Sequence, residues 1–197
     1  MGKIIYGNKN FGYAPINLSQ GTYSFGTPVI LTGMVSATAE VEENSTNIYA
    51  DNMVYCVVEG AKTRNLTATL KYITEAYAEF LGFKQQTNGM LVDTGDKPNH
   101  CVFFETEEKD CETGDATRTL HYFYNVKASQ PSLESSTTEE EIESADLEIE
   151  YLALDSQFVV DADGNKVGYG KMTRTEANKN LYDTFTTKVI LPTDAIA

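Results

Sequence analysis

Cysteine, histidine and tryptophan are scarce in this 197-residue sequence, which has three cysteines, two histidines and no tryptophan. The cysteines, Cys56, Cys101 and Cys111, are odd in number and irregularly spaced, which excludes a disulfide framework and a paired CxxC zinc site. This usage fits a reducing cytoplasm. No apolar run approaches the ~18 residues that a membrane-spanning helix needs, so we expect no membrane contact.

Positive charge is also in short supply. The chain has 15 Lys and Arg against 29 Asp and Glu, which gives a formal net charge of -14. Such a surface keeps a protein soluble and repels the phosphates of free nucleic acid. We therefore expect no sequence-specific DNA recognition.

The motifs of common catalytic and cofactor sites are missing. His100 and His121 do not lie beside a Ser, Cys or Asp in a catalytic pattern, and no GxGxxG, GxxxxGKS, HExxH or GxSxG string occurs. The stretch DADGN at 161–165 fails as a calcium loop because Gly164 is its fourth residue, whereas an EF-hand needs Gly sixth. We therefore expect a hairpin turn there, and no catalytic residue, metal ligand or cofactor. A carboxylate pair across a cleft stays open as an alternative.

The residues that are present favour β-structure. Hydrophobic residues make up 41% of the chain, with 12 Tyr and 9 Phe, and short runs of Thr, Tyr, Val and Phe are separated by Gly, Asn and Asp. Polar and apolar residues alternate over 35–42 and again over 65–72, the period of a half-buried strand. We predict that these two strands pair as a hairpin joined by a long, mostly polar loop at about 43–52.

Further elements follow the same patterns. Residues 74–82 predict a short helix capped by Thr74 and ended by Gly82. Strands are predicted around 101–108, 119–128 and 147–154, and a weak second helix at 175–185. The Ser- and Glu-rich segment 132–146 has the composition of an exposed loop.

The predicted fold class is mainly β. We expect a β-sandwich or curled antiparallel sheet with one short helix, a long hairpin loop, extended terminal arms and a free C-terminal tail. The chain is interpreted as one domain over 1–197. Residues 1–24 form an N-terminal segment, 25–156 the core, and 157–197 a hairpin, a weak helix and the tail.

The order of these elements resembles the major tail proteins, or tail-tube proteins, of long-tailed non-contractile bacteriophages (siphophages). The resemblance covers about residues 25–156 and is carried by PVILTGMVSATAEVEEN running into STNIYADN, LTATLKYIT, TEAYAEFLGF, KPNHCVFFETEE, LHYFYNVKASQP and ADLEIEYLALDS. Residues after about 157 match the pattern less clearly.

The resemblance implies a structural virion protein, made and assembled in the bacterial host cytoplasm and located in the tail. Six copies would form a ring, and stacked rings a tube that meets a tape-measure protein, a tail terminator and a distal tail protein. About four strands per subunit at ~4.8 Å spacing give a barrel roughly 37 Å across, wide enough for duplex DNA to pass without specific binding.

The resemblance also assigns residues to two surfaces. The lumen would be lined by polar residues of the two alternating strands, which include no Lys or Arg: Ser36, Thr38, Glu40, Asn65, Thr67 and Thr69. The contact to the next ring would be made by the hairpin loop: Glu43, Asn44, Ser45, Thr46, Asn47, Ile48, Tyr49, Asp51 and Asn52. Two alternatives remain, a monomeric β-sandwich binding or adhesion module that uses exposed tyrosines, and an enzyme with an unrecognised carboxylate site.

Overall fold

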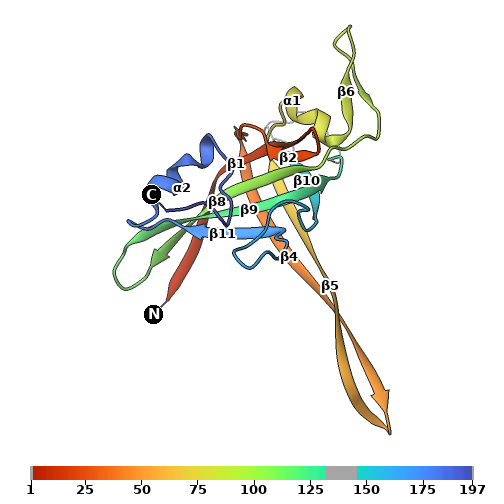
Figure 1. Cartoon of the computed structure of the whole chain (residues 1–197). Helices are drawn as coiled ribbons and strands as arrows, with labels where there is room; N and C mark the ends of the chain where they lie inside the picture. The colour runs from red at the N-terminus through yellow and green to blue at the C-terminus, as the bar shows by residue number, and fades with distance from the viewer. Residues whose placement is uncertain (1, 132–145, 197) are drawn as a thin grey trace, which may run out of the picture.

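The computed structural model describes residues 2–131 and 146–196, and within strands it leaves the side chains of residues 3, 44 and 59–62 undescribed. The strands in this part of the chain are β1 (Lys3–Ser19), β2 (Thr22–Phe25), β3 (Val29–Ile30), β4 (Met34–Ala50), β5 (Met53–Leu70), β6 (Phe83–Gln85), β7 (Leu91–Asp93), β8 (His100–Asp110), β9 (Ala116–Ala128), β10 (Leu147–Ala153) and β11 (Tyr169–Thr173). Two short α-helices, α1 (Glu75–Ala78) and α2 (Lys179–Tyr182), each run into a 3-10 turn, over Glu79–Leu81 and Asp183–Thr186. The mainly β prediction is confirmed (Figure 1).

Nine of these strands form one curled antiparallel sheet. Its order is β2-β1-β8-β9-β10-β5-β4, with β3 added beside β1 and β11 beside β9, while β6 and β7 form a separate pair. Strand β10 shows why the chain folds this way, because Ile149, Tyr151 and Ala153 are buried whereas Glu148 and Glu150 between them are exposed. Sheet curvature brings the apolar side chains of its inner face together.

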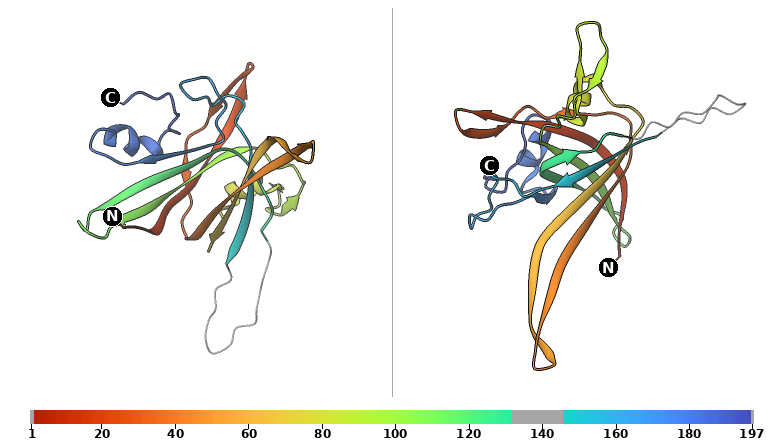
Figure 2. Two further views of the ribbon diagram at one scale, coloured as in Figure 1. Left: turned by 90° about the horizontal axis from the view of Figure 1, so that it is seen from below. Right: turned by 90° about the vertical axis from the view of Figure 1, so that its right-hand side faces the viewer.

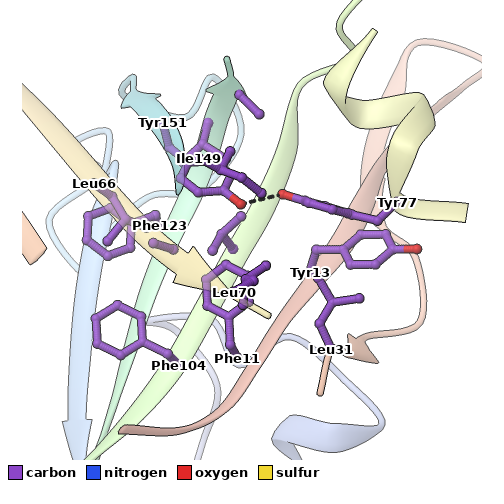
Figure 3. Packing of buried hydrophobic residues seen from close by; sticks show 14 of the residues in the cluster. Phe11, Tyr13, Leu31, Leu66, Leu70, Tyr77, Phe104, Phe123, Ile149 and Tyr151 are labelled. Atoms are coloured by element: carbon purple, nitrogen blue, oxygen red, sulfur yellow. Dashed lines mark hydrogen bonds between the residues drawn. The ribbon is translucent and has the colours of Figure 1, made fainter. Parts of the chain in front are cut away.

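The main core lies on the inner side of this curled sheet (Figure 3). Side chains from β1, β5, β8, β9, β10 and α1 meet there, and the Tyr77 hydroxyl donates to the Tyr151 hydroxyl at 2.8 Å. The largest fully buried members of this cluster are Tyr77, Tyr151, Phe11, Phe123, Leu66, Leu70, Leu81 and Ile149. The two tyrosine hydroxyls satisfy each other inside an apolar cluster, where an unpaired hydroxyl would be costly.

Helix α1 begins and ends where the sequence indicates. Thr74 is its N-cap and accepts a hydrogen bond from the Tyr77 backbone N–H at 3.3 Å. Gly82 follows the 3-10 turn with a φ of +95°, a left-handed conformation that glycine adopts without steric cost. The predicted helix at 74–82 is confirmed, and it carries Tyr77 and Leu81 into the core.

The C-terminal part of the chain covers the outer face of β8 and β9. Tyr182, Phe185, Val189 and Ile190 are buried in a second apolar cluster there. The Tyr124 hydroxyl donates to the Ile190 carbonyl oxygen at 2.9 Å. The prediction of a free C-terminal tail is therefore wrong for residues up to 194, because a short apolar run finds a partner surface far away in sequence.

A buried carboxylate joins both terminal segments to the sheet. Glu105 of β8 is 1% exposed and accepts a hydrogen bond from the Tyr182 hydroxyl at 2.7 Å. It also accepts one from the Asn10 side-chain amide of β1. These hydrogen bonds satisfy a polar side chain that would be costly to bury without partners. Within the N-terminal segment 1–24, Lys3–Ser19 form a strand of the main sheet, and the sequence did not indicate this.

Two other predictions concern loops. Residues 161–165 form a hairpin turn, in which Asp161 Oδ1 accepts from the backbone N–H groups of Asp163 and Asn165 and Gly164 has a φ of +84°, so the turn prediction is confirmed. The weak second helix lies at α2, within the predicted range. Residues 132–145 of the acidic segment lie outside the described residues.

The long hairpin formed by β4 and β5 departs from the prediction in its connection. Strand pairing continues from Ser36 opposite Thr69 to Ala50 opposite Met53, with irregularities near Glu43 and Ile48. Asp51 and Asn52 alone make the turn, with φ values of +52° and +64°. Positive φ at both central residues is typical of the two-residue hairpin turn whose twist matches that of its strands. The expected loop at 43–52 is therefore a strand and a tight turn, and Figure 1 shows it extending away from the body.

Gly12→Ala is expected to destabilise the subunit by about 1–3 kcal/mol, the usual cost of overpacking. A Cβ at Gly12 would lie 2.6 Å from Phe103 Cζ and 2.7 Å from the Val29 carbonyl oxygen. Gly2→Ala is the control, since nothing lies within 4 Å of its Cβ. Urea unfolding of the dilute subunit measures both variants, and equal midpoints would contradict this close packing.

Candidate functional site

Groups that often perform catalysis are used here for packing. His100 is fully buried and its Nε2 lies 3.0 Å from the Tyr77 hydroxyl, while its Nδ1 lies 3.1 Å from the Pro98 carbonyl oxygen. Burial lowers the pKa of His100 to about 4, and the Pro98 contact opposes this only in part. Burial likewise raises the pKa of the Cys101 thiol well above its ordinary value. A neutral imidazole and a protonated thiol in an apolar core are poorly placed for chemistry on a solute.

His121 is held in a similar way on β9. Its Nε2 lies 3.0 Å from Thr106 Oγ1 and its Nδ1 lies 2.8 Å from the Tyr169 hydroxyl, and its ring stacks on Phe104. Burial is the main cause that lowers the pKa of this imidazole, and Lys171 lowers it further. Among residues 2–131 and 146–196, no three His, Cys, Asp or Glu side chains come together as a metal site would require.

The six residues assigned to the lumen share one face of the β4–β5 hairpin. Ser36 stands opposite Thr69, Thr38 opposite Thr67, and Glu40 opposite Asn65. Ser36 Oγ donates to Thr69 Oγ1 at 3.0 Å. All six are exposed or half-buried, whereas Leu66, Ala68 and Leu70, which alternate with them on β5, are fully buried. The hairpin therefore has a polar outer face backed by the main core.

Strand β10 widens this polar face. Glu148 stands opposite Thr69, Glu150 opposite Thr67 and Leu152 opposite Asn65, so these three residues lie on the same side of the sheet as the predicted set. We call the polar face of β4, β5 and β10 the wall face. The sequence showed the acidic alternation of β10 but not its pairing with β5, so Glu148 and Glu150 were missed.

Two basic residues lie beside the wall face, although neither belongs to the six residues assigned to the lumen. Lys127 of β9 stands opposite Leu152, with Lys97 nearby in the same depression. This shallow depression has a volume of about 480 Å³, and its lining includes Glu40, Thr67 and Glu150. Glu40, Glu148 and Glu150 therefore lie on a surface with Lys97 and Lys127 at its edge.

The far end of the hairpin is exposed and mostly uncharged. The nine residues assigned to the contact lie at the end of β4 and in the turn, and the side chain of Asn44 is not described. Ile48 and Tyr49, two of these nine residues, are exposed, with Tyr49 at 67%. Strand β5 adds exposed apolar residues that the sequence pattern did not indicate: Met53, Val54, Tyr55, Val57 and Val58. Tyr55 is 76% exposed. Asp51 is the one charged residue of the stretch 44–58.

Exposed apolar side chains of this number along one projecting hairpin are unusual in a monomeric soluble protein and mark interaction surfaces. Among the described residues, no helix is long and apolar enough to cross a bilayer. The exposed apolar side chains of the hairpin are therefore suited to contact with another protein.

Comparison with known proteins agrees with this architecture. No curated protein sequence matches the chain. A family model described as phage tail tube protein matches residues 2–197, which is nearly the whole chain and includes the C-terminal part that the sequence patterns matched less clearly. The chain therefore belongs to the family of phage tail tube proteins.

Proposed function

We propose that six copies of the chain close into a ring, that rings stack into the tail tube, and that the wall face lines a channel through which the phage genome passes. Membership of the family supports a structural role in the virion tail and self-assembly into a tube. The observation that carries the finer proposal is the wall face itself, a polar surface on three adjacent strands whose other side is the main core.

The β4 edge of the sheet could form the contact that closes the ring. Strand β4 is the last strand in the sheet order, and within the described residues it pairs with β5 on one side only. The backbone N–H and C=O groups along such an edge can pair with another chain, and closure into a barrel removes the edge. In the proposed ring, β4 pairs with a neighbouring subunit and extends the wall face around the lumen.

The charge of the wall face suits a conduit. Glu40, Glu148 and Glu150 repel DNA phosphates, and the Ser and Thr side chains between them offer neutral hydrogen-bonding groups. A lysine-rich wall would hold phosphates by releasing counterions, and each contact would add to the retention. In this proposal Lys127 lies at the margin of the wall, and the tape-measure protein fills the lumen before DNA does.

Assembly is tested by electron microscopy of the purified chain at rising concentration, alone and together with neighbouring tail proteins. Hollow tubes built from six-membered rings are expected. A particle that stays monomeric under every condition would contradict the proposal and favour the binding-module alternative.

Thr38→Lys combined with Glu40→Lys is expected to slow DNA ejection at least about ten-fold, because every ring adds lysines along the path of the phosphates. Both side chains are exposed, so the folding free energy should change by less than about 0.5 kcal/mol per site. Ejection is followed by dye fluorescence after phage particles carrying the variant are triggered to release DNA.

The matched control is Gln157→Lys with Asp163→Lys, which adds the same charge at two exposed positions outside the wall face. This control should eject DNA at the normal rate. Equal rates for the wall variant and the wild type would show that the wall face does not line the channel.

A further inference from the structure

Two hairpins project from opposite ends of the subunit. Figure 1 and the right-hand view of Figure 2 show β4 and β5 extending from one end and β6 and β7 from the other. We call residues 44–58 the long hairpin tip and residues 83–93 the short hairpin. In a polar stack of rings, the end of one subunit that carries the long hairpin tip faces the opposite end of a subunit in the next ring.

The base of the short hairpin is held by the body of the molecule. Phe83 packs against the main core at its base. The Gly82 carbonyl oxygen accepts hydrogen bonds from the Thr94 backbone N–H at 2.8 Å and from Thr94 Oγ1 at 3.0 Å. Gln85 Nε2 donates to Glu75 Oε2 of α1 at 3.2 Å. A surface fixed in this way loses little conformational entropy on binding.

The exposed side chains of the two hairpins match in kind. Met90, Leu91 and Val92 are exposed on the short hairpin. Tyr49 and Tyr55 are the most exposed large apolar residues of the long hairpin tip. Burying such groups against each other removes apolar area from water, which is the main driving force of association.

Charge explains why contact would occur at these two ends. Each copy carries a net charge of -14, so two copies repel each other over most of their surface. The long hairpin tip has a single charged residue, Asp51, and the short hairpin has two of opposite sign, Lys84 and Asp93. The formal net charges of these two segments are -1 and 0, so they can meet without the repulsion that the rest of the chain imposes.

We propose that the short hairpin is the surface that receives the long hairpin tip of a second copy of this chain in the adjacent ring. This inference rests on the proposed stacking of rings and names the acceptor side of that contact. The contact joins two different surfaces, so it does not close on itself and repeats along a filament. Met90, Leu91 and Val92 cover the aromatic and aliphatic side chains of the tip, and Lys84 lies near Asp51.

Cysteine crosslinking in assembled tubes tests the contact. Cys56 is an exposed native cysteine on the long hairpin tip, so a partner cysteine is needed only on the short hairpin. The variant Leu91→Cys in a Cys111→Ser background is assembled and treated with a short bismaleimide. We expect a ladder of multiples of the subunit mass, because each subunit then links to one in the ring above and one in the ring below.

Val160→Cys in the same background is the matched control, since Val160 is 37% exposed and Leu91 39%, and it lies outside both hairpins. Tubes that form normally but show no more crosslinking for Leu91→Cys and Met90→Cys than for this control would overturn the proposed acceptor while leaving the tube intact. If both short-hairpin variants fold but fail to assemble while Val160→Cys assembles, the short hairpin is confirmed as an assembly surface. If the unmodified chain forms no tubes, the proposed function itself fails, and this contact fails with it.

Discussion

Replacing Tyr49 and Tyr55 by aspartate should give a folded subunit that no longer assembles into tubes. Both rings are more than half exposed, so their loss leaves the subunit core untouched. In the assembled tube they would be buried, and each aspartate would bring an unpaired charge into the contact. We expect each substitution to remove about 2 kcal/mol or more of binding free energy between subunits of adjacent rings. Together the two substitutions weaken this binding about 1000-fold.

Sedimentation and electron microscopy measure this effect, and circular dichroism checks the fold. Tyr55→Phe keeps the aromatic ring and should still assemble, and Val160→Asp, which adds a charge at an exposed apolar position outside both hairpins, should assemble as well. Normal tubes from the double aspartate variant would show that the long hairpin tip does not connect rings.

Acidification should destabilise the subunit through His100, by about 2 kcal/mol between pH 7.5 and pH 5. Burial lowers the pKa of this imidazole to about 4 from an ordinary value of 6.5. The unfolded chain therefore takes up a proton at pH values where folded His100 stays neutral. The contribution of neutral His100 to stability is complete above about pH 6.5 and declines as the pH falls toward 4. The groups packed around the ring, Tyr13, Tyr77, Phe80 and Tyr151, are uncharged in this range.

The matched variant is His100→Gln, which can keep a hydrogen bond to Tyr77 but does not titrate. Between pH 7.5 and pH 5, the free energy of unfolding of this variant should fall by about 2 kcal/mol less than that of the unmodified protein, even if its stability at pH 7.5 is lower. His121 has a lowered pKa of its own and stays in both proteins, so its contribution cancels in the comparison. Identical pH profiles for the two proteins would contradict the buried, neutral state of His100.

Much of the fold follows from local patterns. The alternation of Ile149, Tyr151 and Ala153 with Glu148 and Glu150 predicts a strand with one buried face, and the structure has it as β10. Helix α1 could be predicted in full because a capping threonine, apolar spacing and a terminal glycine all lie within nine residues.

Other parts could not be predicted because their stability comes from distant partners. Strand β1 has left-handed backbone at Gly7 and Asn10 and register shifts beside them, so its sequence shows no regular alternation. Strand β1 is stabilised by its pairing with β8 and not by the local β-propensity of its residues. Val189 and Ile190 likewise form only a short apolar run until the outer face of β9 is known.

The candidate site also has one part that local sequence patterns predict and another part that depends on distant strand pairing. A common face for Thr38, Glu40 and Thr67 could be predicted from a period of two residues, since it depends only on neighbouring strands. Its extension to Glu150 could not, because that needs the pairing of β10 with β5 across a sequence separation of about 80 residues. Their place in a lumen stays a prediction.

The most direct test of the account is a cryo-electron microscopy reconstruction of the assembled tube in which side chains are visible. We expect rings of six subunits, with Thr38, Thr67 and Glu150 of every copy facing the central channel and the long hairpin tip lying against the adjacent ring. A tube in which these three residues face outward, or are buried between subunits, would contradict the central claim that the wall face lines the path of the genome.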